Sequence, residues 1–128
     1  MVKTNRQKFG YWGEGVAGEY LIKKGYIILD RNVRTPYGEI DLIAQEANVK
    51  SSGLLIFVEV KTRKTNTYGF PEDAITAQKR EHMISSAEFY LQEHANFSGD
   101  WRIDVISIRK VKESKSLEII HFENAVSE

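Results

Sequence analysis

The sequence predicts an α/β fold with a central sheet of about five strands and two main helices. Its most informative stretch is LLIFVEVKTR, from Leu54 to Arg63, in which six of the first seven residues are apolar. Such a run indicates a strand that is buried on both faces and therefore lies in the middle of a sheet. Four other segments have strand-like patterns, and two have the periodicity of amphipathic helices. Together these observations favour a domain organised around this central strand.

Length and composition are those of one domain spanning residues 1–128. The chain has 128 residues, of which 41% are hydrophobic and 28% charged, enough for a single core. No apolar run approaches the roughly 20 residues that cross a bilayer, and the first residues lack the apolar core of a signal peptide, so we expect a cytoplasmic protein without membrane contact. Cysteine is absent, which excludes disulfides, thiolate metal sites and a thiol nucleophile. Eighteen basic and eighteen acidic residues cancel, so binding to nucleic acid would depend on a local basic patch.

The N-terminal part contains a basic arm followed by a helix. Residues 1–8 carry basic side chains among polar ones and are expected to be flexible, either as a frayed terminus or as a functional arm. From Phe9 to Lys24 the apolar residues recur at helical spacing, and Gly25 supplies a stop. Glycines inside this helix indicate the close approach of another element. Glu14 lies at the margin of the apolar stripe and is either a solvated helix acid or an active-site acid.

Two strands joined by a tight turn are expected next. Residues Tyr26 to Arg34 begin apolar and become polar, as in an outer strand, and Pro36 to Gly38 have the composition of a turn. The strand Gly38 to Ala44 contains Asp41 between two apolar residues, which is unusual because aspartate is depleted in strands and such anomalies concentrate at functional sites. Alternation places one set of side chains on one face (Glu39, Asp41 and Ile43) and the other set on the opposite face (Ile40, Leu42 and Ala44).

Asp41 is expected to lie beside two charged residues of the central strand. The polar segment 45–53 suits a hairpin loop, which would place Asp41 near Glu59 on the neighbouring strand. Lys61 follows two residues later on the same face. Burying an unpaired carboxylate costs several kcal/mol, so Glu59 needs a partner such as Lys61, a metal ion or a substrate proton. These residues form an acid, acid, lysine cluster at one end of the sheet.

A second amphipathic helix is expected from Thr76 to His94, with its first residue as the N-cap. It follows a basic, polar segment at residues 62–68 and a turn at residues 69–71. Gln78 and Lys79 fall in the first turn of this helix. Lysine there opposes the helix dipole, so Lys79 is either solvated or reaches an anion.

The C-terminal part is predicted to form two strands, Trp101 to Ile108 and Leu117 to Phe122, which extend the sheet. Asp104 in the first of them is interpreted as a loop-pairing or edge-strand acid rather than a metal ligand. The histidines have no spacing typical of zinc ligands, and the sequence has no phosphate-binding glycine loop or nucleophile elbow. The acid, acid, lysine cluster is therefore the strongest candidate site in the sequence.

The order of these motifs resembles the YraN-like uncharacterised family, which looks like a branch of the PD-(D/E)XK nuclease superfamily, close in pattern to Holliday-junction resolvases. The resemblance covers nearly the whole chain and rests on short motifs: Gly13-Glu14, GEIDLI at 38–43, FVEVKTR at 57–63, Lys79, RIDV at 102–105 and Asn124-Ala125. One difference is Ile40, which replaces the superfamily's proline before the aspartate. The resemblance implies a restriction-endonuclease-like core, with a mixed central sheet flanked by two main helices.

The resemblance also implies roles for individual residues. Asp41, Glu59 and the Val60 carbonyl would hold Mg²⁺ or Mn²⁺, since hard divalent ions prefer oxygen ligands. Lys61 would orient or deprotonate the attacking water and offset charge in the transition state. Glu14, a catalytic candidate, would complete the metal site from the first helix. Four residues would contact the nucleic acid: Arg63 and Lys64 along the backbone, and Gln78 or Lys79 at the scissile phosphate.

Three classes of function remain open. The favoured one is a metal-dependent endonuclease that hydrolyses phosphodiester bonds in branched or structured nucleic acid, with DNA as the expected substrate. The alternative is a non-catalytic nucleic-acid-binding module or assembly factor that keeps the nuclease fold, and the third is another phosphoester or small-molecule enzyme. The complete set of Asp41, Glu59 and Lys61 favours the first class. A homodimer is expected because so small a protein presents little basic surface to a junction.

Overall fold

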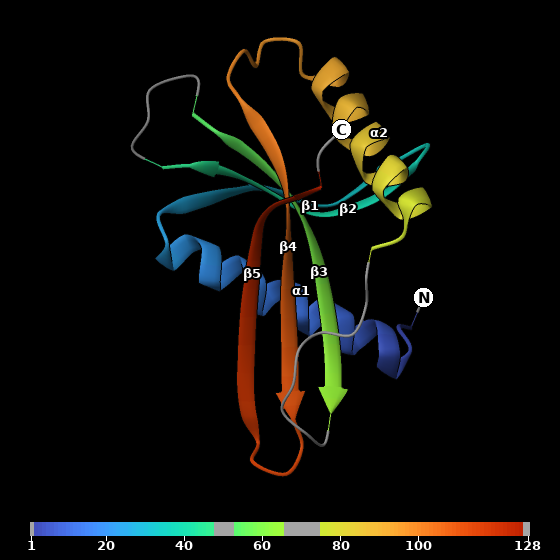
Figure 1. The fold of residues 1–128 in the computed structure, drawn as a ribbon, viewed down its shortest axis with the longest axis vertical. Coiled ribbons are helices and arrows are strands. Elements are labelled where there is room, and N and C mark those ends of the chain that lie inside the picture. Colours follow the sequence, from blue (N-terminus) through green and yellow to red (C-terminus); the bar gives the residue numbers. More distant parts are fainter. Residues whose placement is uncertain (1, 48–52, 66–74, 127–128) are drawn as a thin grey trace.

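The computed structural model describes residues 2–47, 53–65 and 75–126 and contains two helices and five strands in this part of the chain (Figure 1). In chain order these are α1 (Asn5–Lys23), β1 (Tyr26–Thr35), β2 (Gly38–Glu46), β3 (Leu55–Thr65), α2 (Ala77–Glu93), β4 (Trp101–Val111) and β5 (Ser116–Val126). The turn predicted at residues 69–71 lies outside the described residues. The expected α/β fold, with a mixed sheet of five strands and two helices, is confirmed.

The strands form one sheet in the order β1-β2-β3-β4-β5, so β3 lies at its centre and β1 at an edge, as predicted. β1, β2 and β3 pair antiparallel, β3 and β4 pair parallel, and β4 and β5 pair antiparallel. Parallel neighbours need a crossover connection, and α2 lies within the one that joins β3 to β4. α1 covers one face of the sheet and α2 covers the other (Figure 1).

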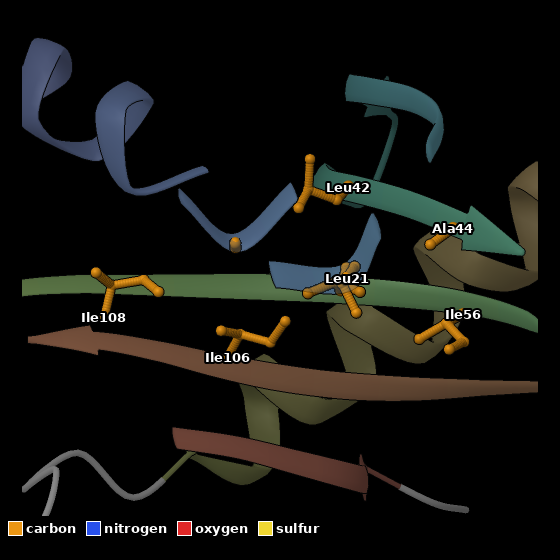
Figure 2. Packing of buried hydrophobic residues seen from close by; sticks show 8 residues of the cluster. Leu21, Leu42, Ala44, Ile56, Ile106 and Ile108 are labelled. Carbon is orange, nitrogen blue, oxygen red and sulfur yellow. The ribbon is translucent and has the colours of Figure 1, made fainter. Parts of the chain in front are cut away.

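Alternate residues of the inner strands fill two layers of core. Leu42, Ile56 and Ile106 face α1, where the Leu21 side chain packs among them with no exposed surface (Figure 2). Phe57 faces the opposite way and belongs to the layer under α2. Each fully buried aliphatic side chain stabilises the fold by about 1.5–3 kcal/mol relative to exposure. Burial on both faces explains why the sequence of β3 is an almost continuous apolar run.

α1 begins at Asn5, earlier than the predicted Phe9. Thr4 is its N-cap: the Thr4 hydroxyl accepts a hydrogen bond from the Gln7 N–H (3.1 Å), and the Gln7 side chain accepts one from the Thr4 N–H (2.8 Å). Such a capping box satisfies two backbone donors that a helix start otherwise leaves free. The prediction that residues 1–8 form an arm outside the helix is therefore wrong for residues 5–8.

Two glycines shape α1 as the sequence indicated. Gly13 is buried where the helix meets β3, and a Cβ at this position would lie 2.0 Å from the Thr62 hydroxyl oxygen, so only glycine allows this approach. The helix backbone consequently lies on the sheet one residue before Glu14. At the other end Gly25 has a φ of 99°, a conformation that glycine adopts without strain, and the predicted stop is confirmed.

The remaining elements agree with the predicted types, with longer strands. Thr76 caps α2 as expected, since its hydroxyl accepts a hydrogen bond from the Lys79 N–H (3.1 Å). β4 and β5 form the predicted hairpin, but Asp104 lies in β4 between β3 and β5, so its interpretation as an edge-strand acid is wrong. Neither described helix combines the length and the apolar character that crossing a membrane requires.

The predicted face of Ile40 is wrong. Ile40 packs in the α2-side core with Ile43, whereas Leu42 faces α1. Pairing between β2 and β3 ends at Leu42, so the beginning of β2 is not held in line with the rest of the sheet. The tip of the β1–β2 hairpin lies instead against α2, where the Thr35 and Ser86 hydroxyls form a hydrogen bond (2.9 Å).

Candidate active site

The site is built where β2 and β3 separate. Because their pairing ends at Leu42, the N–H groups that β3 directs towards β2 beyond this point need another acceptor. Asp41 provides it: its Oδ2 accepts a hydrogen bond from the Val60 N–H over 2.8 Å. The aspartate that is anomalous in a strand sequence thus has a structural reason to be there, and its carboxylate is fixed beside Glu59.

Glu59 lies on the α2 side of β3 and pairs with a lysine from that helix. Its Oε1 is 3.3 Å from Nζ of Lys79, in the first turn of α2. The Glu59 side chain is 18% exposed and that of Lys79 is 45% exposed, so the acid is sheltered and its counterion reaches in from solvent. The sequence predicts that the Glu59 carboxylate has a partner, and in the structure this partner is the Lys79 ammonium group. Of the two alternatives for Lys79, contact with an anion is the one observed.

Burial and mutual repulsion shift the protonation of this cluster. Burial, followed by the charge of Glu59, raises the pKa of Asp41 to about 8, although the hydrogen bond from Val60 acts in the opposite direction. Burial, followed by the charge of Lys79, lowers the pKa of Lys61. Asp41 is therefore mostly protonated at neutral pH. Shifts of this kind concentrate at functional sites, because catalysis needs groups whose protonation changes near the working pH.

Glu14 reaches the same end of the sheet from α1. With its amide nitrogen facing the acids, Asn32 donates hydrogen bonds to Glu14 Oε1 (3.0 Å) and to Glu39 Oε1 (2.9 Å). Burial raises the pKa of Glu14, and the hydrogen bond from Asn32 opposes this shift. The charge of Glu14 also contributes to the raised pKa of Asp41. Glu14 is thus a partly buried acid with a fixed partner, close enough to act on Asp41 electrostatically.

Sequence reasoning did not identify Asn32. Its φ of 51° is in the left-handed region, which asparagine tolerates better than most residues. A groove of about 430 Å³ opens beside it, between the N-terminal half of α1 and the β1–β2 hairpin. The lining residues are Lys3, Gln7, Gly10, Tyr11, Glu14, Asn32, Arg34 and Glu39. A polar ligand can therefore approach Glu14 from this side.

Asp41, Glu59 and the Val60 carbonyl, which the sequence predicts as metal ligands, offer oxygen atoms of the kind that Mg²⁺ and Mn²⁺ prefer. Within residues 2–47, 53–65 and 75–126, no three acidic or histidine side chains form a group that could hold a metal ion. Glu14 consequently does not join Asp41 and Glu59 in one ligand group. Two carboxylates and a carbonyl would leave coordination positions of such an ion for water and substrate oxygens.

The residues predicted to contact nucleic acid lie on two elements and on different faces. Lys79 is at the acid cluster, and Gln78 is exposed beside it in the first turn of α2. Arg63 and Lys64 lie near the end of β3, where Nζ of Lys64 is 4.9 Å from the centre of the Phe9 ring on α1. The structure therefore brings Lys79 to the acids and directs Lys64 towards α1.

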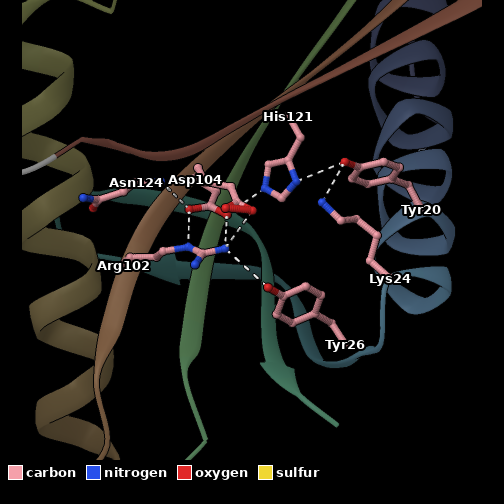
Figure 3. A network of polar contacts seen from close by, with 8 residues as sticks. Tyr20, Lys24, Tyr26, Arg102, Asp104, His121 and Asn124 are labelled. Carbon is pink, nitrogen blue, oxygen red and sulfur yellow. Dashed lines mark hydrogen bonds and ion pairs between the residues drawn. The ribbon is translucent and has the colours of Figure 1, made fainter.

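A polar network near the C-terminal half of α1 was also missed from the sequence (Figure 3). Asp104 has no exposed surface, and its carboxylate is 2.9 Å from Arg102 Nε, 2.7 Å from His121 Nε2 and 2.8 Å from the Asn124 N–H nitrogen. His121 Nδ1 lies 3.2 Å from the Tyr20 hydroxyl on α1. Because these groups satisfy one another, the network joins β4, β5 and α1 and is structural rather than part of the acid cluster.

Comparisons with known proteins match the chain over most of its length. The sequence model of "Uncharacterised protein family UPF0102" matches residues 13–108, which include the predicted site residues from Glu14 to Lys79. A UPF0102 protein of Syntrophotalea carbinolica is 40% identical over 120 residues, which are 94% of this chain and 92% of the relative. A UPF0102 protein of Dehalococcoides mccartyi is 38% identical over 124 residues, which are 97% of each chain. Pyrococcus furiosus SfsA, solved in complex with Ca²⁺, matches with a TM-score of 0.40 and 15% identity, over 90% of this chain and 64% of that one.

Proposed function

This chain belongs to the uncharacterised protein family UPF0102, and we propose from its site that it is a metal-dependent endonuclease that hydrolyses phosphodiester bonds in branched or structured nucleic acid. The observation behind the proposal is a pair of acids on neighbouring strands, accompanied by two lysines. Asp41 is held by the Val60 N–H at 2.8 Å, and Glu59 is paired with Lys79 at 3.3 Å. Lys61 lies close enough to Glu59 and Lys79 for the charges of both to affect its pKa. Such a group can hold a cation and a phosphate next to each other.

The donor set fits a hard divalent cation. The carboxylates of Asp41 and Glu59 and the carbonyl of Val60 would hold Mg²⁺ or Mn²⁺. Such an ion, when bound, polarises the phosphoryl group and makes a coordinated water more acidic. The repulsion between the two acids, which helps to raise the pKa of Asp41, supports this assignment because a cation would offset it.

Lys61 is the candidate for handling the attacking water. Its pKa is lowered by burial and by Lys79, so more of it is present as the neutral amine at neutral pH than in an exposed lysine, and only the neutral amine can act as a base. Lys79, which pairs with Glu59, would hold the scissile phosphate, with the exposed Gln78 beside it. Glu14, held by Asn32, would orient water at the edge of the site.

The order of the elements supports placement in the PD-(D/E)XK nuclease superfamily. A helix that carries Glu14 precedes three antiparallel strands, and the acids lie on the second and third of these strands. The crossover helix α2 then leads to the parallel strand β4. The motifs that resemble this superfamily therefore lie on elements of the types and order that the resemblance implies.

The substrate class is inferred from charge. The formal net charge of the chain is zero, so long duplexes gain little from general electrostatic attraction, and few phosphates can be neutralised at once. In a branched substrate several strands meet, so phosphates of more than one strand can contact the same small basic surface. A homodimer would place two such surfaces on one junction.

The proposal is tested with a panel of four-way junctions, forks and linear duplexes, in DNA and RNA versions, incubated with Mg²⁺, Mn²⁺ or a chelator. Metal-dependent cleavage of branched substrates is expected, and Lys61→Ala should abolish it. Lys23→Ala, which changes an exposed lysine in the last turn of α1, is the matched control and should cleave as the wild type does. Binding without cleavage under every metal condition would favour the non-catalytic binding module. A protein that neither binds nor cleaves any substrate would contradict a nucleic-acid function.

A further inference from the structure

Two lysines are neighbours in the sheet, away from the acid cluster. Lys64 on β3 and Lys110 on β4 are direct partners in the parallel ladder. Both side chains lie on the α1 face, since each reaches an aromatic ring of that helix. Like charges at neighbouring positions destabilise a sheet. An anion bound between the two ammonium groups would relieve this repulsion.

Each of these lysines lies over an aromatic ring. Nζ of Lys64 is 4.9 Å from the centre of the Phe9 ring, and Nζ of Lys110 is 5.7 Å from that of Trp12. Phe9 and Trp12 are one turn apart on α1 and stack with their centroids 5.5 Å apart and their planes inclined by 13°. Trp12 is 40% exposed, so part of its ring faces solvent. We call this group of four residues the aromatic-lysine platform (Phe9, Trp12, Lys64 and Lys110).

The surroundings of the platform are basic, although the chain as a whole is neutral. The first turn of α1 contains no acidic residue. Exposed cations accumulate around this end of the helix, namely Lys3, Arg6 and Lys8. Lys3 lies over the ring of Tyr11, with Nζ 3.5 Å from its centre, and both residues line the groove that also contains Glu14 and Glu39. The balanced composition requires a local basic patch for any binding to nucleic acid, and the two lysines of the platform with the acid-free first turn of α1 have that character.

We propose that the aromatic-lysine platform binds an unpaired segment of the nucleic acid, with a base stacked on Trp12 and the adjoining phosphates held by Lys64 and Lys110. This inference rests on the proposed function and specifies which part of a branched substrate the protein recognises. Stacking on an aromatic side chain suits any base, because every base has a flat face, but it requires a base that is free of its duplex stack.

The platform lies on the elements that also carry the site. Lys64 follows Lys61 by three residues on β3, a rise of roughly 10 Å. Trp12 precedes Glu14 by two residues on α1. The platform is on the α1 face of the sheet and Glu59 pairs with α2 on the other face, so a strand bound to the platform would pass an end of the sheet to reach the acids.

A second copy of the chain fits this surface less well than nucleic acid does. Two copies that met through their platforms would bring two pairs of lysines together, and neither the platform nor the first turn of α1 contains an acid to offset them. A nucleic acid provides negative charges and flat rings in the same ligand.

Binding is measured by fluorescence anisotropy in the presence of a chelator, so that cleavage does not interfere. A duplex with a single-stranded overhang is compared with a blunt duplex. Trp12→Leu keeps an apolar side chain without the flat ring and is expected to weaken binding to the overhang substrate about tenfold, within the range for loss of one base stack. Trp12→Phe should retain most of the affinity. Phe122→Leu, which removes another exposed ring on β5, is the matched control.

The lysines are tested through the salt dependence of binding. Lys64→Gln and Lys110→Gln should each lower the slope of affinity against salt concentration by about one. Lys23→Gln, at the far end of α1, should leave it unchanged. In a Trp101→Phe background, where Trp12 is the remaining tryptophan, titration with oligo-dT should quench the fluorescence.

These outcomes distinguish failure of this inference from failure of the proposed function. If folded Trp12→Leu binds the overhang as tightly as the wild type, the platform does not stack a base, whether or not the wild type cleaves DNA. If Trp12→Leu changes the sedimentation of the free protein but not its DNA binding, the surface is an interface between copies and the inference is overturned. If overhang binding depends on Trp12 but no metal supports cleavage, the platform stands and the endonuclease proposal fails.

Discussion

The carboxylate of Asp41 accepts a hydrogen bond from the Val60 N–H, 2.8 Å away, at the point where β2 stops pairing with β3. Asp41 therefore satisfies a backbone donor of the sheet and also places a second acid beside Glu59. An asparagine at this position could still accept the hydrogen bond but would carry no charge. That substitution separates the structural role of Asp41 from its chemical role.

Asp41→Asn is expected to stabilise the metal-free protein, increasingly so as the pH rises. The pKa of Asp41 is about 8 in the folded protein, above its ordinary value of 3.8, so the carboxyl contributes stability at low pH that is lost as the pH rises from 3.8 towards 8. Asparagine does not titrate. The gain in unfolding free energy should be larger at pH 9 than at pH 5 by roughly 1 kcal/mol or more. Urea unfolding in chelator measures this difference, and a variant less stable than the wild type at pH 9 would show that the charged carboxylate is itself structural.

Binding of Mg²⁺ is expected to release a proton at pH 7. Asp41, with its raised pKa, is mostly protonated there, and a carboxylate must lose its proton to bind a metal ion. Calorimetric titrations in two buffers with different ionisation enthalpies should therefore give different heats. Asp41→Asn should abolish this difference and weaken the binding. Equal heats for the wild type in both buffers would mean that Asp41 does not bind the ion.

Lys79→Gln is expected to separate metal binding from nucleic-acid binding. Nζ of Lys79 is 3.3 Å from Oε1 of Glu59 and so competes with a cation for this carboxylate. Removing the lysine charge should therefore tighten Mg²⁺ binding several-fold, and it should weaken binding to the phosphates of a junction. Because the Lys79 side chain is 45% exposed, the loss of the pair should change stability by less than about 1 kcal/mol. Calorimetry, anisotropy and thermal melts are compared with those of Lys23→Gln. Weaker Mg²⁺ binding by Lys79→Gln would show that the lysine supports the metal site rather than competing with it.

Asp104→Asn is expected to destabilise the fold by about 3–5 kcal/mol, because it leaves Arg102 and His121 without the buried carboxylate that joins them. Asp100→Asn, at an exposed position, should change stability by no more than about 0.5 kcal/mol. Chemical unfolding of both variants provides the comparison. A loss below 1 kcal/mol for Asp104→Asn would show that the network contributes little to the fold.

The sequence predicted the features that depend on local pattern. The apolar run of β3 followed from burial on both faces, and the hydroxyl of Thr76 was recognisable as a helix cap. The capping box of Thr4 and Gln7 was equally local, but the basic residues around it suggested a flexible arm. Asp41 and Glu59 lie near each other, as the predicted hairpin requires, because β2 and β3 pair antiparallel.

Other features depend on tertiary contacts that no local pattern contains. Ile40 packs on the face opposite to the predicted one because the tip of the β1–β2 hairpin lies against α2 and does not pair with β3. The partners of Asp104 come from β5, and His121 in turn meets Tyr20, 101 residues away in the sequence. The pairing of Lys64 with Lys110 required the parallel register of β3 and β4.

The endonuclease proposal is tested most simply by the single-turnover cleavage rate of a four-way DNA junction with the protein in excess and Mg²⁺ present. Asp30→Asn, which changes an exposed acid on the neighbouring strand β1, is the matched control. We expect the wild type and Asp30→Asn to cleave at the same rate, and Asp41→Asn to be slower by roughly a hundredfold or more while binding the junction equally well in chelator. Equal cleavage rates for Asp41→Asn and Asp30→Asn, or no cleavage by the wild type with Mg²⁺ or Mn²⁺, would contradict the proposal.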